Sequence, residues 1–101
     1  MRKRIVYTEH ISLRLRMRNL PRVLPIQTVR NPRHIYFDSK TKLFIAVKEL
    51  RDGPSGEAET FMVAFLESDS ILKLITIHPL KRNQELNRVS EKRWLRISKK
   101  N

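Results

Sequence analysis

The pattern of hydrophobic positions predicts four strands in the middle of the chain. Residues 34–38 and 42–50 are runs of β-branched and aromatic side chains, and the short polar connection between them suits a hairpin. Residues 60–67 and 70–78 flank a tight Ser-Asp-Ser turn and form a second hairpin. Residues 51–57, which separate the hairpins, contain both glycines of the chain, so we expect a mobile loop there.

These strands have to be covered on one face. Runs such as Phe44–Val47 are too apolar to stand in water, and the two ends of the chain are the only candidate cover. We therefore expect a single α+β domain in which two N-terminal helices pack on a four-stranded antiparallel meander sheet. A short strand or extended arm at residues 4–7 precedes the helices, and the first helix packs across the sheet.

Residues 10–19 carry two conflicting signals. Apolar residues at the odd positions alternate with polar residues at the even positions, and strict alternation is typical of a strand. The residue types, however, are mainly Leu, Arg and Met, which are good helix formers. Thr8 suits an N-cap, Glu9 suits a first helical turn and Pro21 suits a stop, so we expect a helix.

This helix would carry a row of basic side chains on one face. His10, Arg14 and Arg18 follow one another at i, i+4 and i+8, a spacing that places them on the same side. We expect the row to lie half-buried against the margin of the sheet. Arg16 and Asn19 are expected to face solvent.

A second short helix is predicted over about residues 22–30. Pro21 and Pro25 fit near its first turn, where the missing N–H groups cost nothing. The Asn-Pro pair at 31–32 ends it, because the residue before a proline leaves the helical region. In the C-terminal segment, three apolar residues are candidates to dock a partial helix: Leu86, Val89 and Trp94.

The charge is segregated along the chain. The 22 Lys and Arg residues against 10 Asp and Glu give a net charge of +12 and a pI near 11.0. Residues 1–36 sum to +8, residues 37–78 to −2 and residues 79–101 to +6. General solubility explains a high total but not this segregation, so we expect a polyanionic partner. An anionic membrane surface is the alternative that charge alone leaves open.

Length and composition indicate one domain with three parts. Residues 1–36 form a basic helical part, residues 37–78 the antiparallel sheet, and residues 79–101 a basic segment ending in a solvated tail at 97–101. The absence of cysteine excludes disulfides, thiolate metal sites and a cysteine nucleophile, and fits a reducing cytoplasm. The chain shows neither an apolar run long enough for a membrane span nor a signal-peptide pattern, so we expect a cytoplasmic protein.

Several motifs occur together in the order seen in one family. The row His10-x-x-x-Arg14-x-x-x-Arg18 is followed by Leu20, by Val29-x-Asn31-Pro32 and by Ile-Thr-Ile-His-Pro in the last predicted strand. In this order the chain resembles the small His-Arg-Arg domains grouped with the RelE/ParE and BrnT toxins, within the wider barnase, EndoU and colicin-type ribonuclease fold. Residues 88–94 are similar to a segment of BrnT-like proteins. The resemblance covers most of residues 7–94 and departs from the family at Asn19, where glycine is usual, and in the two prolines of the second helix.

The resemblance implies metal-independent cleavage of RNA, in which a 2′-hydroxyl attacks the adjacent phosphate. His10 would act as acid or base, because histidine titrates near physiological pH. Arg14, Arg18 and Arg93 would hold the phosphoryl oxygens in the transition state. We expect no cofactor and no metal ion, because the three histidines lack metal-ligand spacing. His34 and His78 are predicted to be structural.

Further residues are expected to contact nucleic acid. The cations among them would contact phosphates, and Trp94 would stack on an unpaired base. The set comprises Arg16, Arg22, Lys81, Arg82, Arg88 and Trp94. Structural alternatives stay open at this point, since Trp94 could belong to the core and His10 could hydrogen-bond a neighbouring strand.

Two functions from different classes follow. The first is a toxin-like, metal-independent endoribonuclease that an acidic, antitoxin-like protein inhibits by covering the basic face. The alternative is a non-catalytic module on the same fold that binds RNA or DNA, and a pure protein-interaction domain is the third. No membrane partner is expected. We favour the endoribonuclease, because a histidine at the head of an arginine row suits proton transfer better than charge alone.

Overall fold

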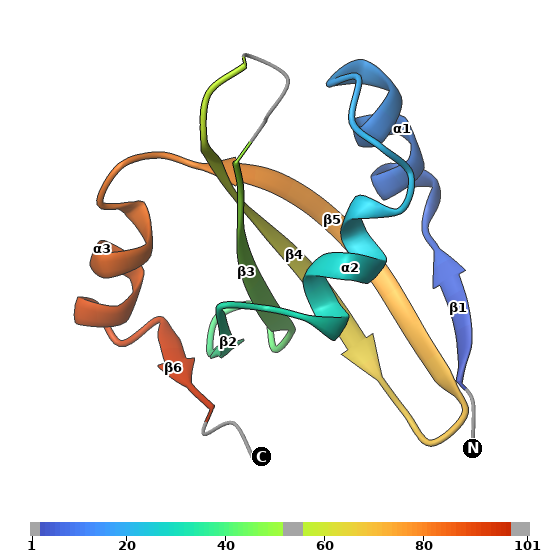
Figure 1. Cartoon of the computed structure of the whole chain (residues 1–101). Helices are drawn as coiled ribbons and strands as arrows, with labels where there is room; N and C mark the ends of the chain where they lie inside the picture. Colours follow the sequence, from blue (N-terminus) through green and yellow to red (C-terminus); the bar gives the residue numbers. More distant parts are fainter. Residues whose placement is uncertain (1–2, 52–55, 98–101) are drawn as a thin grey trace.

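The computed structural model describes residues 3–51 and 56–97, which form a mixed sheet with three helices (Figure 1). Parts of the predicted loop at 51–57 and of the predicted tail at 97–101 lie outside the described residues. The elements are β1 (Arg4–Tyr7), α1 (Glu9–Met17), α2 (Leu24–Arg30), β2 (His34–Asp38), β3 (Phe44–Leu50), β4 (Glu59–Glu67), β5 (Ile71–Leu80), α3 (Gln84–Ser90) and β6 (Trp94–Arg96).

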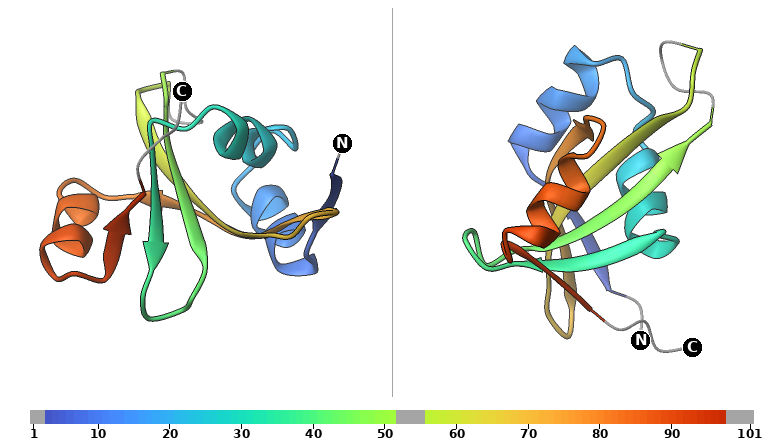
Figure 2. Two further views of the ribbon diagram at one scale, coloured as in Figure 1. Left: turned by 90° about the horizontal axis from the view of Figure 1, so that it is seen from below. Right: turned by 90° about the vertical axis from the view of Figure 1, so that its left-hand side faces the viewer.

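The sheet has six strands in the order β1-β5-β4-β3-β2-β6 among the described residues. Strands β2 to β5 pair antiparallel in sequence order, whereas β1 pairs parallel with β5 and β6 pairs antiparallel with β2. Figure 2 shows β1 at one end of the molecule, with α3 and β6 at the other. The domain is α+β, but the predicted four-stranded antiparallel meander under two helices is wrong.

The physical reason lies in the length of the two added strands. β1 is the strand or extended arm expected at residues 4–7, but a segment of 4 residues carries no local signal for the strand with which it pairs. β6 has 3 residues, which is too short for the period of hydrophobic positions to reveal a strand. Both become strands because they complete the hydrogen bonding of β5 and β2, whose outer edges would otherwise be open. That completion depends on contacts between distant parts of the chain.

Both faces of the sheet are buried, rather than the one face expected. Ala46 belongs to a core under α1 and α2, while its neighbours Ile45 and Val47 belong to a second core with Trp94. This two-sided burial explains why the run Phe44–Val47 is continuously apolar. Helix α2 crosses β3, β4 and β5 on the side of the first core.

Helix α1 is fixed to the edge of β5 by Thr8, the residue directly before the helix. The hydroxyl of Thr8 accepts a hydrogen bond from the N–H of Ile11 at 3.1 Å and donates one to the carbonyl of Ile75 at 2.7 Å. Thr8 is therefore both the N-cap and the link to the sheet, at the point where the pairing of β1 with β5 ends. Ile11 and Leu15 are buried, so the helix interpretation of residues 10–18 is the one that the structure shows.

A β-bulge in β5 changes which side chains face which core. Ala64 pairs with Thr76 and Phe65 with Leu74, which leaves Ile75 as an extra residue. Leu74 and Ile77 therefore both lie in the first core although they are three positions apart. His78 is turned to the opposite face, where its partner Met62 belongs to the second core.

Helix α3 forms in the C-terminal segment but does not dock as expected. Leu86 is 68% exposed and Val89 is also exposed, whereas Trp94 is buried in the second core. None of the residues in α3 is buried, so apolar packing does not hold the helix in place. No helix in the described part of the chain is long and apolar enough to cross a membrane.

Candidate nucleic-acid interface

A groove of about 420 Å³ lies between α1, the end of β5, α3 and β6, and is called the central groove below. Met62 and His78 contribute from the sheet, and Arg18 contributes from the end of α1. The described cations that line it are Arg18, Lys81, Arg88 and Arg93. The fold thus brings the basic N-terminal and C-terminal parts of the chain together around one hollow.

Of the three residues of the row on α1, only Arg18 is among the residues that line this groove. His10 and Arg14 are neighbours, with 3.5 Å between His10 Nε2 and Arg14 Nε, and Arg18 lines the groove itself. All three side chains act electrostatically on His78. Arg14 is half-buried as expected, but His10 and Arg18 are exposed, because α1 sits at the edge of β5 rather than across the sheet.

His78 is held in its neutral form within this cationic surrounding. Burial lowers the pKa of its imidazole, and the positive charges of Arg14, Arg18 and His10 lower it further. Its Nε2 lies 3.3 Å from the hydroxyl of Thr76. A neutral imidazole beside several cations can accept a proton while the cations hold an anionic ligand.

The sequence pattern predicts a structural role for His78 and does not predict its place on the groove. Simple alternation along β5 would place residue 78 on the same face as Leu72 and Leu74, in the first core. Only the bulge at Ile75 turns it toward the groove. The signal present in the sequence is the position of this histidine directly before Pro79, at the end of an apolar strand.

Arg93 is oriented by the buried carboxylate of Asp38. Its Nε lies 3.2 and 3.3 Å from the two carboxylate oxygens, and its Nη2 donates to Oδ2 at 3.2 Å. The Nη1 group has no partner among the described residues. Arg93 is therefore held in one orientation with one donor group left for a ligand.

Asp38 is ionised although its side chain is only 4% exposed. Burial alone would raise the pKa of this carboxyl, but hydrogen bonds from Arg93 and from the N–H groups of Thr41 and Lys40 outweigh burial. The pKa of Asp38 is consequently about 2. The indole N–H of Trp94 also donates to Oδ2 at 3.3 Å.

Trp94 lines the groove but does not present a free ring face to it. The side chain is 3% exposed and stacks on Tyr36, with 5.3 Å between ring centroids and 30° between planes. Because β6 pairs with β2, the ring lies in the second core, which is the structural alternative left open for Trp94. Its role in the site is to help hold Asp38.

The remaining predicted contacts lie outside the central groove. Arg16 and Arg22 line a separate hollow beside Ser12 and Asn19, on another face of α1. The guanidinium of Arg22 also lies 4.5 Å from the centroid of the Tyr7 ring. Arg82 lies beyond Lys81, in a neighbouring pocket.

Comparisons with known proteins add nothing to this geometry, since no family model, no curated protein and no solved structure matches the chain. The resemblance to the RelE/ParE and BrnT toxins stays a prediction. Within residues 3–51 and 56–97, no three His, Asp or Glu side chains gather in a way that could hold a metal ion.

Proposed function

We propose that the protein is a metal-independent endoribonuclease whose central groove binds RNA. The observation that carries the proposal is the position of His78, a neutral imidazole on the groove surface within the electrostatic reach of Arg14, Arg18 and His10. A groove that only binds phosphate needs cations alone. Proton transfer additionally needs a group that is uncharged at working pH, and His78 supplies it.

In the proposed reaction, His78 accepts the proton of a ribose 2′-hydroxyl, and the 2′ oxygen attacks the adjacent phosphorus. The bond from phosphorus to the 5′ oxygen breaks, and that oxygen takes a proton from the cationic form of His10. The products are a 2′,3′-cyclic phosphate and a free 5′-hydroxyl, and solvent restores the two histidines to their starting forms. Arg14, Arg18 and Nη1 of Arg93 would stabilise the negative oxygens of the phosphorane.

One observation favours the non-catalytic binding module as the second candidate. The only hydrogen-bond partner of His10 among the described residues is Arg14, at the long distance of 3.5 Å. No carboxylate among those residues orients the ring, as a carboxylate often does for a catalytic histidine. On this reading the same cations bind RNA but no bond is broken.

Cleavage of an end-labelled, mixed-sequence RNA in EDTA tests the proposal. We expect fragments with 2′,3′-cyclic phosphate ends, and a rate about a hundredfold lower in His78→Gln and in His10→Gln. Lys73→Gln is the control, because Lys73 is exposed on β5 and does not line the groove, so its loss should leave the rate unchanged. RNA that is bound but stays intact supports the binding module instead. Wild-type rates in both histidine variants overturn the proposed roles of His78 and His10.

A further inference from the structure

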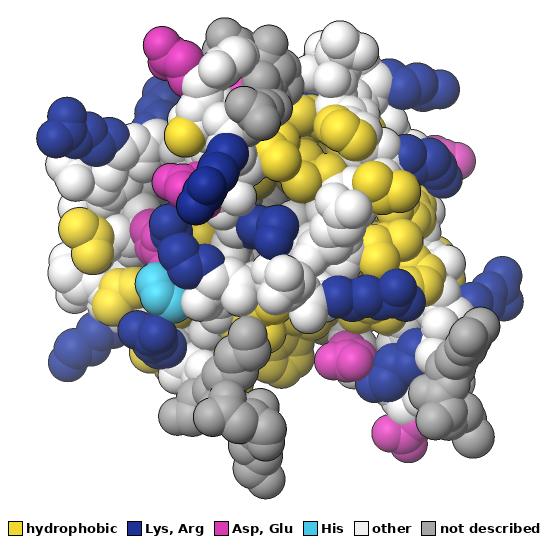
Figure 3. Space-filling model, viewed as in Figure 1, with side chains coloured by type: hydrophobic (Ala, Val, Ile, Leu, Met, Phe, Trp, Pro, Cys, Tyr) yellow, Lys and Arg dark blue, Asp and Glu magenta, His cyan; other side chains and the backbone are white. Residues whose placement is uncertain are grey.

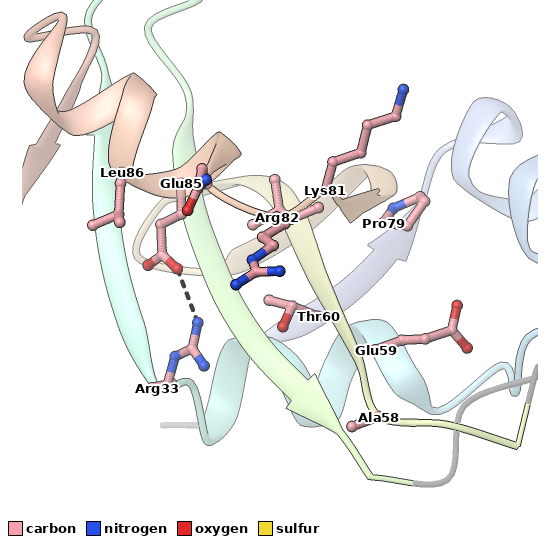
Figure 4. A pocket seen from close by; sticks show the side chains of 11 residues that line it. Arg33, Ala58, Glu59, Thr60, Pro79, Lys81, Arg82, Glu85 and Leu86 are labelled. Atoms are coloured by element: carbon pink, nitrogen blue, oxygen red, sulfur yellow. Dashed lines mark hydrogen bonds and ion pairs between the residues drawn. The ribbon is translucent and has the colours of Figure 1, made fainter.

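A second pocket, of about 430 Å³, lies on the other side of the segment that follows β5 (Figure 4). Arg33, Arg82 and Glu85 are among its lining residues, and it is called the flanking pocket below. It shares a wall with the central groove, because residues 79–81 line both hollows. The two sites are therefore adjacent and are separated by a narrow ridge.

We propose that the flanking pocket binds a neighbouring backbone phosphate of the same RNA strand that occupies the central groove. The substrate is then an extended single strand that crosses the ridge formed by residues 79–81. This inference rests on the proposed function, since it extends the RNA site rather than defining a separate activity.

One cation reaches into the flanking pocket, and a second, Lys81, stands on the wall that the pocket shares with the central groove. Figure 4 shows the guanidinium of Arg82 reaching into the pocket, on the same side of the ridge as Thr60. Neither this guanidinium nor the ammonium of Lys81 has a partner among the described residues. A planar guanidinium donates well to phosphate oxygens, and Lys81 can reach either hollow because it lines both.

The acidic residues of the pocket do not cancel these cations. Glu85 is already engaged by Arg33 Nη2 at 2.9 Å, by the hydroxyl of Tyr36 at 2.6 Å and by His34 Nδ1 at 2.9 Å. In Figure 4 the carboxylate of Glu59 points away from Arg82. Figure 3 shows basic and acidic side chains interleaved over the region between α3 and β4, so the local charge depends on this pairing rather than on composition alone.

The arrangement of the two hollows favours a single strand over a duplex. A strand that enters both has to turn over the ridge at residues 79–81, which an unpaired backbone does by rotating its torsions. A regular duplex would have to lose base pairs to do the same. Leu80 and the 68% exposed Leu86 also line the flanking pocket and offer apolar surface to a sugar or an unstacked base.

The test compares the affinity for a short and a long strand that cannot be cleaved. The probes are a 2′-O-methyl dinucleotide and a 2′-O-methyl octanucleotide, titrated in EDTA and followed by fluorescence anisotropy. In the wild type we expect the long strand to bind at least about tenfold more tightly than the short one. In Arg82→Ala this ratio should fall by about tenfold, which corresponds to one charge-assisted hydrogen-bonded contact.

Arg4→Ala is the matched control, because it removes one exposed arginine from β1, at the far edge of the sheet, and should leave the ratio unchanged. Arg82→Lys should recover part of the ratio. The flanking pocket is overturned as an RNA site if the ratio of the two affinities is the same in the wild type and in Arg82→Ala. It is also overturned if a duplex binds as tightly as the single strand. Neither result affects the proposed RNA cleavage by the wild type. A wild-type protein that neither binds nor cleaves RNA overturns the proposed function and this inference together.

Discussion

Asp38 is the residue on which the C-terminal wall of the central groove depends. Its carboxylate orients Arg93, accepts from the indole of Trp94 and accepts from two backbone N–H groups of the β2–β3 turn. Loss of a buried acceptor leaves each of these donors without its partner, and such losses are costly in a low-dielectric surrounding. The orientation of Arg93 and the stability of the second core are thus coupled through one side chain.

Asp38→Asn should lower the free energy of unfolding by about 3 kcal/mol at neutral pH. The pKa of Asp38 is about 2 in the folded protein and has an ordinary value of 3.8, so its contribution is complete above the ordinary value and lost as pH falls toward 2. Urea unfolding at pH 7 and near pH 3 checks this. The difference in the free energy of unfolding between wild type and variant should be smaller near pH 3. Asp69→Asn, in the exposed β4–β5 turn, is the control; a gap that is the same at both pH values contradicts the assignment.

At the scale of elements, α3 is held by a polar anchor in place of an apolar face. Glu85 accepts hydrogen bonds from Tyr36 and His34 of β2 and pairs with Arg33 just before that strand. Burial would raise the pKa of Glu85, but the hydrogen bonds from Tyr36 and His34 and the charge of Arg33 outweigh it, so the pKa is lowered. The helix that carries Arg88 into the groove therefore depends on an ionised Glu85.

Glu85→Gln should destabilise the protein by about 2 kcal/mol at neutral pH and weaken RNA binding, because α3 loses its anchor. Since the folded pKa of Glu85 is lowered, wild-type stability from this group is present above its ordinary pKa of 4.5 and fades as pH falls below it. Chemical denaturation and RNA titration measure the two effects. Glu49→Gln, at an exposed position of β3, should change neither; an equal effect in both variants would refute the anchor.

The stability of the protein at alkaline pH depends on the same contact, between Tyr36 and Glu85. Burial, followed by the hydrogen bond and charge of Glu85, raises the pKa of Tyr36 to about 12. Because the folded pKa exceeds the ordinary value of 10.0, the contribution of Tyr36 is complete below pH 10 and is lost as pH rises through 12. The wild type should therefore lose stability as pH rises from 10 to 12, and Tyr36→Phe should lose less over that range. Thermal unfolding at stepped pH measures the difference. Tyr7→Phe is measured in parallel, because burial also raises the pKa of Tyr7; an effect of Tyr36→Phe no larger than that of Tyr7→Phe contradicts the role of Glu85.

At the scale of the whole molecule, the net charge of +12 is concentrated where the basic N-terminal and C-terminal parts of the chain meet. The groove and the flanking pocket collect cations from α1, α3, β6 and the ridge, which are far apart in the sequence. Binding of a strand that contacts about four phosphates should depend on salt with a log–log slope of roughly −3.

Arg18→Ala should reduce the magnitude of that slope by about 0.7, the amount expected for one phosphate contact on a single strand. Affinity for a non-cleavable single strand measured over a series of KCl concentrations checks it. Arg30→Ala, at the exposed end of α2, removes the same charge away from the groove and should leave the slope as it is. A slope near zero in the wild type would contradict an electrostatic interface.

Local patterns in the chain were enough to predict β2 to β5, α1 and α2, because side-chain periodicity, caps and prolines act over a few neighbouring residues. They also marked Arg18, Lys81, Arg88 and Arg93, which line one groove. Charge segregation along the chain predicts a polyanionic partner, and this stays a prediction.

The folded chain alone decided the rest. A strand or extended arm at residues 4–7 was expected, but the parallel pairing of β1 with β5 and the existence of β6 depend on hydrogen bonds from distant strands. The burial of Trp94 follows from the pairing of β6 with β2. The bulge at Ile75 turns His78 to the groove, and the shared wall at residues 79–81 joins the groove to the flanking pocket. Register and edge pairing are settled by contacts between residues far apart in sequence, which local propensity does not encode.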